Sequence, residues 1–308
     1  MGEFEHWLEF GIFVVILLAL DLLVFNKKAH EVKIKEALGW SAFWITLSLA
    51  FGGMVYWWYG YDGAMQYYAA YFVEKSLSMD NLFVFLMIFT YFKIPAKFQH
   101  RVLFWGIIGA IIMRFIFIEV GVTLINQFEW LLFVFGIVLI GSAVKMLRED
   151  KQEIDPEKNG VIRLFKKLVP VTPDVESGHF VVKKDGKKFA TTLLVCLLMI
   201  ETSDVIFAVD SIPAIFGISH DVFIIYSSNI MAILGLRALY FALSAVMKYF
   251  RFLNYGLAVI LSFVGVKMML ATADIYHIEV VTSLIVIFST MAVSMLLSVL
   301  IKPKEEAK

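Results

Sequence analysis

The 308-residue chain has a single cysteine, Cys196, and only six prolines. One cysteine excludes an internal disulfide and any cysteine-based metal cluster. The six histidines all fall in tails, in connections or at the ends of apolar segments, so no histidine cluster is expected at membrane depth. Zn²⁺, Cu⁺ and Fe²⁺ prefer nitrogen and sulfur ligands, and they are therefore disfavoured as occupants of a buried site.

Long polar stretches are also scarce, because hydrophobic residues make up 60% of the chain and the mean hydropathy is +0.81. Runs of about 20 apolar residues are long enough to cross the roughly 30 Å hydrocarbon core of a bilayer. The pattern predicts an all-α polytopic membrane protein, a single membrane domain over 1–308. The nine expected spans are 7–25, 39–59, 67–92, 102–125, 129–147, 190–214, 220–247, 252–271 and 278–300.

Basic residues are missing from every second connection between these spans. Lys and Arg gather in 26–38, 93–101, 148–189, 248–251 and 302–308. The opposite side has no Lys or Arg and carries the acids Asp62, Glu129, Asp221, Asp274 and Glu279. The positive-inside rule then predicts an external amino terminus and a cytoplasmic carboxyl terminus, in a bacterial inner (plasma) membrane. The zero net charge comes from charges segregated by side, so the lipid bilayer is the expected partner and no nucleic acid is.

Charged residues inside the apolar spans recur at a fixed distance. A charge in hydrocarbon costs on the order of 2.5–3.5 kcal/mol on insertion scales, so such residues mark internal pairs or pathways. Here they are duplicated 122–124 residues apart, as Asp80 and Asp204, Arg114 and Arg237, and Lys145 and Lys267.

The recurrence predicts two repeats, about 67–147 and about 190–271, each with three spans. Three is an odd number, so the second repeat crosses the membrane in the opposite sense. Inverted repeats of secondary transporters hold their substrate near the bilayer midplane, at the repeat interface. Helices 1, 2 and 9 are expected to be peripheral.

Two acidic motifs lie near the middle of the third and sixth spans, EKSLSMDNLFVF and ETSDVIFAVDSIP. Counting Asp21 and Glu119, seven acids inside the spans are expected to be buried, against five buried bases that include Lys145. A divalent cation or protonation of some acids would offset this excess. Pro213 frees backbone carbonyls beside Asp210. The expected metal ligands are Glu74, Asp80, Glu201, Asp204 and Asp210, with Asn81 and Ser211 as accessory ligands and Arg114, Arg237, Lys145 and Lys267 balancing charge.

These donors are hard oxygens, which suit Mg²⁺, Ca²⁺ and Mn²⁺. The residues alone leave the choice among the three ions open.

The connection 148–189 is expected to be a cytoplasmic loop. Residues 157–169 predict a short basic amphipathic helix, and 180–190 predict a β-hairpin around Asp185-Gly186. Forty-two residues are too few for a robust independent core, so a solvated linker is the expected state.

The two acidic motifs and the basic residues downstream of each resemble those of the TerC family of bacterial integral membrane proteins. The resemblance covers essentially the whole length of the chain. The family takes its name from a tellurium-resistance gene cluster, and its members are similar to manganese exporters. The resemblance implies export of Mn²⁺ and carries the family's acidic positions to Glu74, Asp80, Glu201, Asp204 and Asp210.

The resulting hypothesis is an antiporter that exports Mn²⁺ from the cytoplasm in exchange for H⁺, with Ca²⁺ and Mg²⁺ as alternative cargo and no prosthetic group. A rival hypothesis is an assembly or insertion factor for other membrane or exported proteins, with a protein partner at the basic 148–189 loop. An intramembrane enzyme is disfavoured, because no Ser/His, HExxH or Gly-x-Asp arrangement lies in a span.

Overall fold

The computed structural model describes residues 3–23, 34–148, 159–173, 178–184, 186–244 and 252–301. In these ranges the chain forms ten helices and one small sheet. In chain order the elements are α1 (Glu3–Leu23), α2 (Ile34–Tyr91), α3 (Ala96–Gln127), α4 (Leu131–Arg148), α5 (Gly160–Leu168), β1 (Val171–Thr172), β2 (Val181–Lys184), β3 (Lys187–Thr191), α6 (Thr192–Phe216), α7 (Val222–Leu234), α8 (Leu236–Ser244), α9 (Leu253–Thr272) and α10 (Val280–Leu300).

Six helices within the described ranges are long and apolar enough to cross a membrane, namely α2, α3, α4, α6, α9 and α10. A seventh span results if α7 and α8, which meet at a bend of 42°, cross as one. The chain is therefore an all-α, multi-pass membrane protein. The expected number of nine spans stays a prediction.

Helix α2 contains two arms that fold back on each other. Gly60 interrupts its 58 residues with φ +73° and ψ −167°, a backbone conformation that favours glycine. Beyond the turn, the hydroxyls of Tyr67 and Tyr68 each donate to a carbonyl of the first arm, Ser48 O and Leu49 O, both at 2.9 Å. The two arms match the two spans expected at 39–59 and 67–92.

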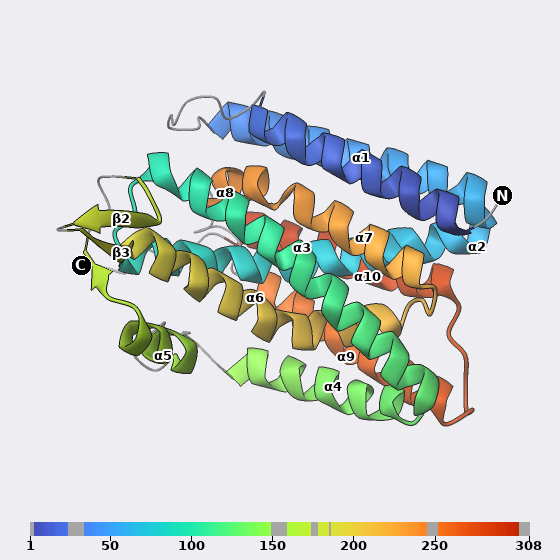
Figure 1. Cartoon of the computed structure of the whole chain (residues 1–308). Coiled ribbons are helices and arrows are strands. Elements are labelled where there is room, and N and C mark those ends of the chain that lie inside the picture. Colours follow the sequence, from blue (N-terminus) through green and yellow to red (C-terminus); the bar gives the residue numbers. More distant parts are fainter. Residues whose placement is uncertain are drawn as a thin grey trace.

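The helices are roughly aligned in one bundle (Figure 1). Helix α4 packs along α9, α2 packs against α7 and α8, and α3 packs against α6. Helix α5 and the strands β2 and β3 gather at one end of the bundle, and the amino-terminal end of α1 lies at the opposite end (Figure 1).

The described part of the 148–189 segment is folded onto the bundle, so the expected solvated linker is wrong there. The expected helix and hairpin are both confirmed: Lys184 pairs with Lys187 across a two-residue loop, and β3 also pairs in parallel with β1. Ile162 of α5 is fully buried in a cluster that includes Leu193 of α6. Arg101 of α3 donates from Nη1 to Gly178 O at 2.7 Å, which ties the segment to the end of α3.

Candidate metal and proton site

Arg114 is a fully buried cation in the middle of the bundle. It lies on the stripe of α3 that faces inward, in helical register with Ala110 and Ile118, which are also buried. Helix periodicity therefore directs the guanidinium into the protein rather than toward lipid. A charge at this depth needs partners, because unpaired burial costs several kcal/mol.

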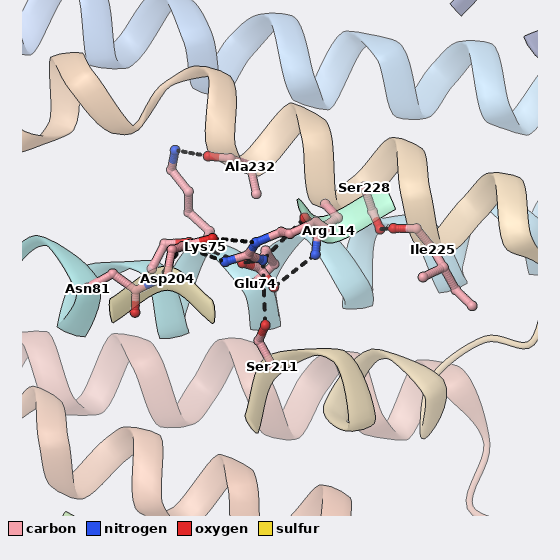
Figure 2. A network of polar contacts seen from close by, with 11 residues as sticks. Glu74, Lys75, Asn81, Arg114, Asp204, Ser211, Ile225, Ser228 and Ala232 are labelled. Atoms are coloured by element: carbon pink, nitrogen blue, oxygen red, sulfur yellow. Dashed lines mark hydrogen bonds and ion pairs between the residues drawn. The ribbon is translucent and has the colours of Figure 1, made fainter. Parts of the chain in front are cut away.

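Two carboxylates from different helices supply those partners. Arg114 Nη1 forms a short ion pair with Glu74 Oε1 of α2. Its other edge faces Asp204 of α6, with Nη2 3.2 Å from Oδ1 and Nε 3.4 Å from Oδ2. Glu74 is fully buried and Asp204 is 4% exposed. The guanidinium thus bridges the two acidic motifs (Figure 2).

Neutral polar groups complete the cluster. Asn229 of α7 accepts from Arg114 Nη1 at its Oδ1 (3.2 Å) and donates through Nδ2 to Glu74 Oε2 (3.2 Å). Ser78 donates to Glu74 Oε1 at 3.3 Å, Asn81 Nδ2 lies 3.5 Å from Asp204 Oδ1, and Ser211 Oγ lies 3.5 Å from Arg114 Nη1. Four helices therefore meet at one set of oxygen and nitrogen atoms, all sheltered from water.

Glu201 lies one turn before Asp204 on α6 and is only partly buried. Its carboxylate rests on Gly109 of α3, where any Cβ would overlap it. Glu201 and Asp204, three residues apart, thus both face α3. The absence of a side chain at Gly109 creates the space for the carboxylate.

Lys75 points away from the cluster, although it follows Glu74 directly. Its ammonium donates to Ala232 O of α7 at 3.1 Å, and the side chain is buried (Figure 2). Lys267 of α9 is also buried and donates to Ser283 Oγ of α10 at 3.0 Å.

The structure brings together Glu74, Asp204, Asn81, Ser211 and Arg114 from the residues expected in the site. The side chains of Asp80 and Asp210 lie outside the part that is described. Within the described residues, no group of three or more His, Cys, Asp or Glu side chains is placed to hold a metal ion.

Two expected burials are wrong. Glu119 is exposed on α3 and Lys145 is exposed on α4, because both lie on helix faces turned away from the bundle. Arg237 is buried in α8, as expected of a charge within a span. Sequence reasoning missed Asn229, for which an amide within the apolar run of α7 was the available signal.

Comparison with known proteins agrees with a multi-pass membrane protein. The model of the "Integral membrane protein TerC family" matches residues 59–306. An "Uncharacterized membrane protein STKORF319" of Myxococcus xanthus is 46% identical over 300 residues, covering 97% of this chain and 93% of that protein. A "Putative membrane-bound redox modulator Alx" of Salmonella typhi is 44% identical over 312 residues, covering 98% and 96%.

A protein of the same name from Escherichia coli (strain K12) is 43% identical over 302 residues, covering 95% of this chain and 93% of that protein. No solved structure matches the chain. The family match and these relatives extend over most of the sequence, including both acidic motifs. The chain belongs to the TerC family of integral membrane proteins.

Proposed function

We propose that the protein exports Mn²⁺ from the cytoplasm by exchange with H⁺ at the buried carboxylates. The observation that carries the proposal is the meeting of Glu74 and Asp204 at Arg114, deep between apolar helices. Membrane proteins retain ionisable groups at such depth mainly where they line a pathway or pair internally. The neighbouring amides and hydroxyls are hard oxygen donors of the kind that Mn²⁺, Mg²⁺ and Ca²⁺ accept.

Helix packing supports a site between two inverted repeats, 67–147 and 190–271. In that scheme the second arm of α2, α3 and α4 correspond to α6, α7–α8 and α9. The packing of α3 on α6 then has its counterpart in the packing of α7–α8 on α2. The third helices, α4 and α9, cross where a Cβ on Gly136 or Gly265 would lie 2.7 Å from the other's carbonyl oxygen.

Arg114 has a defined role in the proposed cycle. Without metal, its guanidinium neutralises part of the negative charge on Glu74 and Asp204. It continues to balance this charge while the empty site returns to the cytoplasmic side. Metal entry displaces the guanidinium from the carboxylates, while Glu201, Asp80 and Asp210 supply further negative charge. Because bound carboxylates must be deprotonated, metal binding releases the protons that acids not paired with Arg114 hold in the empty site.

Coupling is required by the direction of transport. Moving a divalent cation outward against an inside-negative potential costs about 4.6 kcal/mol per 100 mV, twice the value for one charge. Proton entry can supply this free energy when the same acids alternate between metal and H⁺. The basic connections place the 148–189 loop on the cytoplasmic side in this proposal.

The redox name printed for some relatives is not part of this proposal. Cys196 is the sole cysteine of the sequence, and it is fully buried in α6. A dithiol–disulfide cycle needs two cysteines, so one copy of the chain cannot perform it. We also propose no enzymatic activity and no prosthetic group.

Metal flux into proteoliposomes tests the proposal and separates it from the assembly-factor rival. Purified protein is expected to move Mn²⁺ when a proton gradient is imposed, with Ca²⁺ and Mg²⁺ competing less well. Asp80→Asn and Asp204→Asn should each abolish the flux while the protein stays monodisperse, because each removes one ligand charge at nearly constant volume. Normal flux in both variants, or none in the wild type, would overturn the proposal.

A further inference from the structure

The bend between α7 and α8 exposes backbone carbonyls inside the membrane. Helix α7 ends at Leu234, and the Gly235 amide turns to Ile233 O. The last four carbonyls of a helix have no partner within it. In the hydrocarbon region each unsatisfied backbone group costs several kcal/mol, so these carbonyls need donors from elsewhere.

Both arms of α2 supply such donors. Lys75 of the second arm donates from its ammonium to Ala232 O at 3.1 Å. Ser48 of the first arm lies with its hydroxyl 3.2 Å from Met231 O, although its shorter contact, 2.8 Å, is to Trp44 O of its own helix. Ser48 is fully buried and Lys75 is 8% exposed. The Ala232 carbonyl near the end of α7 is therefore capped by Lys75 from another helix, and the Met231 carbonyl beside it faces the Ser48 hydroxyl.

Gly235 makes this approach possible. A Cβ at that position would lie 2.8 Å from Trp44 Cβ and 3.2 Å from Lys75 Nζ. Because Gly235 has no side chain, Trp44 of the first arm of α2 and Lys75 of the second arm can both pack against the bend. The same half-helix α7 carries Asn229, which contacts Glu74 and Arg114, so the position of the bend affects the site.

The charge of Lys75 matches the position it occupies. The carboxyl end of a helix has a partial negative charge of roughly half an electron, which favours a cation. In secondary transporters with broken helices, such half-helix ends and freed carbonyls coordinate the coupling cation. Lys75 also lacks a basic counterpart in the second repeat, where the offset of 124 residues leads to Met199.

We propose that the Lys75 ammonium is a built-in monovalent cation that fills the carbonyl site at the α7–α8 bend. Tethered there, it performs the structural task for which a free Na⁺ would otherwise be needed. Lys75 is then a positioning residue: it holds α7, and with it Asn229, against the second arm of α2. We therefore expect transport to need no Na⁺ or K⁺ at this bend, a consequence that rests on the proposed function.

The test compares unfolding midpoints in detergent, in NaCl and in choline chloride at equal ionic strength. Lys75→Ala leaves the carbonyls and space for a small cation, so Na⁺ should raise its midpoint by at least about 2 °C. The wild type should show no such shift. Lys75→Met, which fills the space without charge, should show none either, and Lys166→Ala on exposed α5 is the matched control.

A monodisperse Lys75→Ala protein with equal midpoints in the two salts would overturn the inference. If that variant does not fold in either salt, Lys75→Ser gives the same test, because its short side chain also leaves the carbonyls and space for a small cation. A folded Lys75→Ser variant without a Na⁺-dependent shift would also overturn the inference. The midpoint does not depend on Mn²⁺ transport, so this result stands apart from the proposed function.

Transport gives the second readout. Mn²⁺ flux through Lys75→Ala proteoliposomes is expected to be lost in choline and to recover in NaCl, whereas wild-type flux is the same in both. Absence of wild-type flux together with a Na⁺ shift in Lys75→Ala would refute Mn²⁺ export and support the cation site. If the wild type transports Mn²⁺, equal flux of Lys75→Ala in the two salts would refute the role of the ammonium.

Discussion

Replacing Arg114 by glutamine removes the cation that joins the two acidic motifs. The guanidinium contacts Glu74, Asp204, Asn229 and Ser211, all sheltered from water. Glutamine can keep one or two hydrogen bonds but leaves two carboxylates without a counter-charge. Breaking a buried pair from one side typically costs about 3–5 kcal/mol. Each kcal/mol moves the unfolding midpoint of a protein of this size class by about 2–4 °C, so a fall of roughly 6–20 °C is expected.

A double-mutant cycle in detergent measures whether this cost comes from charge. Adding Glu74→Gln to Arg114→Gln removes one uncompensated carboxylate, so the double variant should unfold at a higher temperature than Arg114→Gln alone. The single-variant deficit should also shrink as pH falls, because protonation neutralises the remaining acids. Arg148→Gln at an exposed position of α4 is the matched control and should change the midpoint little. A wild-type midpoint for Arg114→Gln, or a further additive loss in the double variant, would refute the reasoning.

Two further predictions concern packing. Gly109→Ala should push the Glu201 carboxylate off α3 and reduce Mn²⁺ flux, whereas Gly141→Ala, which meets no atom within 4 Å, should leave the flux unchanged; equal flux in both variants would contradict a role for Glu201. Ile162→Ala should loosen α5 by about 2–5 kcal/mol and accelerate proteolysis of the 148–189 segment, because a fully buried side chain is truncated. Leu164→Ala is the control at a 58% exposed position, and equal cleavage rates would argue against docking through Ile162.

Charges in apolar spans made the centre of the site predictable. Glu74, Asp204 and Arg114 stand out because hydrocarbon tolerates such residues only with partners. The pairing of individual side chains was harder to predict from the sequence, because Lys75 and Glu74 are adjacent yet contact different partners. The partner of Lys75 is a backbone carbonyl, which no sequence pattern marks.

Helix faces account for the wrong burials. Glu119 and Lys145 are charges within apolar spans, but both lie on faces turned away from the bundle. An apolar run on all sides gives no amphipathic stripe from which the inward face could be read. The docking of α5 also depends on tertiary packing, because Ile162 is buried in a cluster that includes Leu193 of α6.

Proton release on metal binding tests the central claim most directly. Mn²⁺ is added to purified protein in weakly buffered detergent solution that contains a pH dye, and the Asp204→Asn variant serves as control. Exchange at the carboxylates predicts that binding releases protons and that apparent Mn²⁺ affinity rises with pH before it levels off. The Asp204→Asn variant should bind weakly and release fewer protons. Binding that releases no proton and keeps the same affinity from about pH 6 to about pH 8.5 would contradict H⁺ exchange at this site.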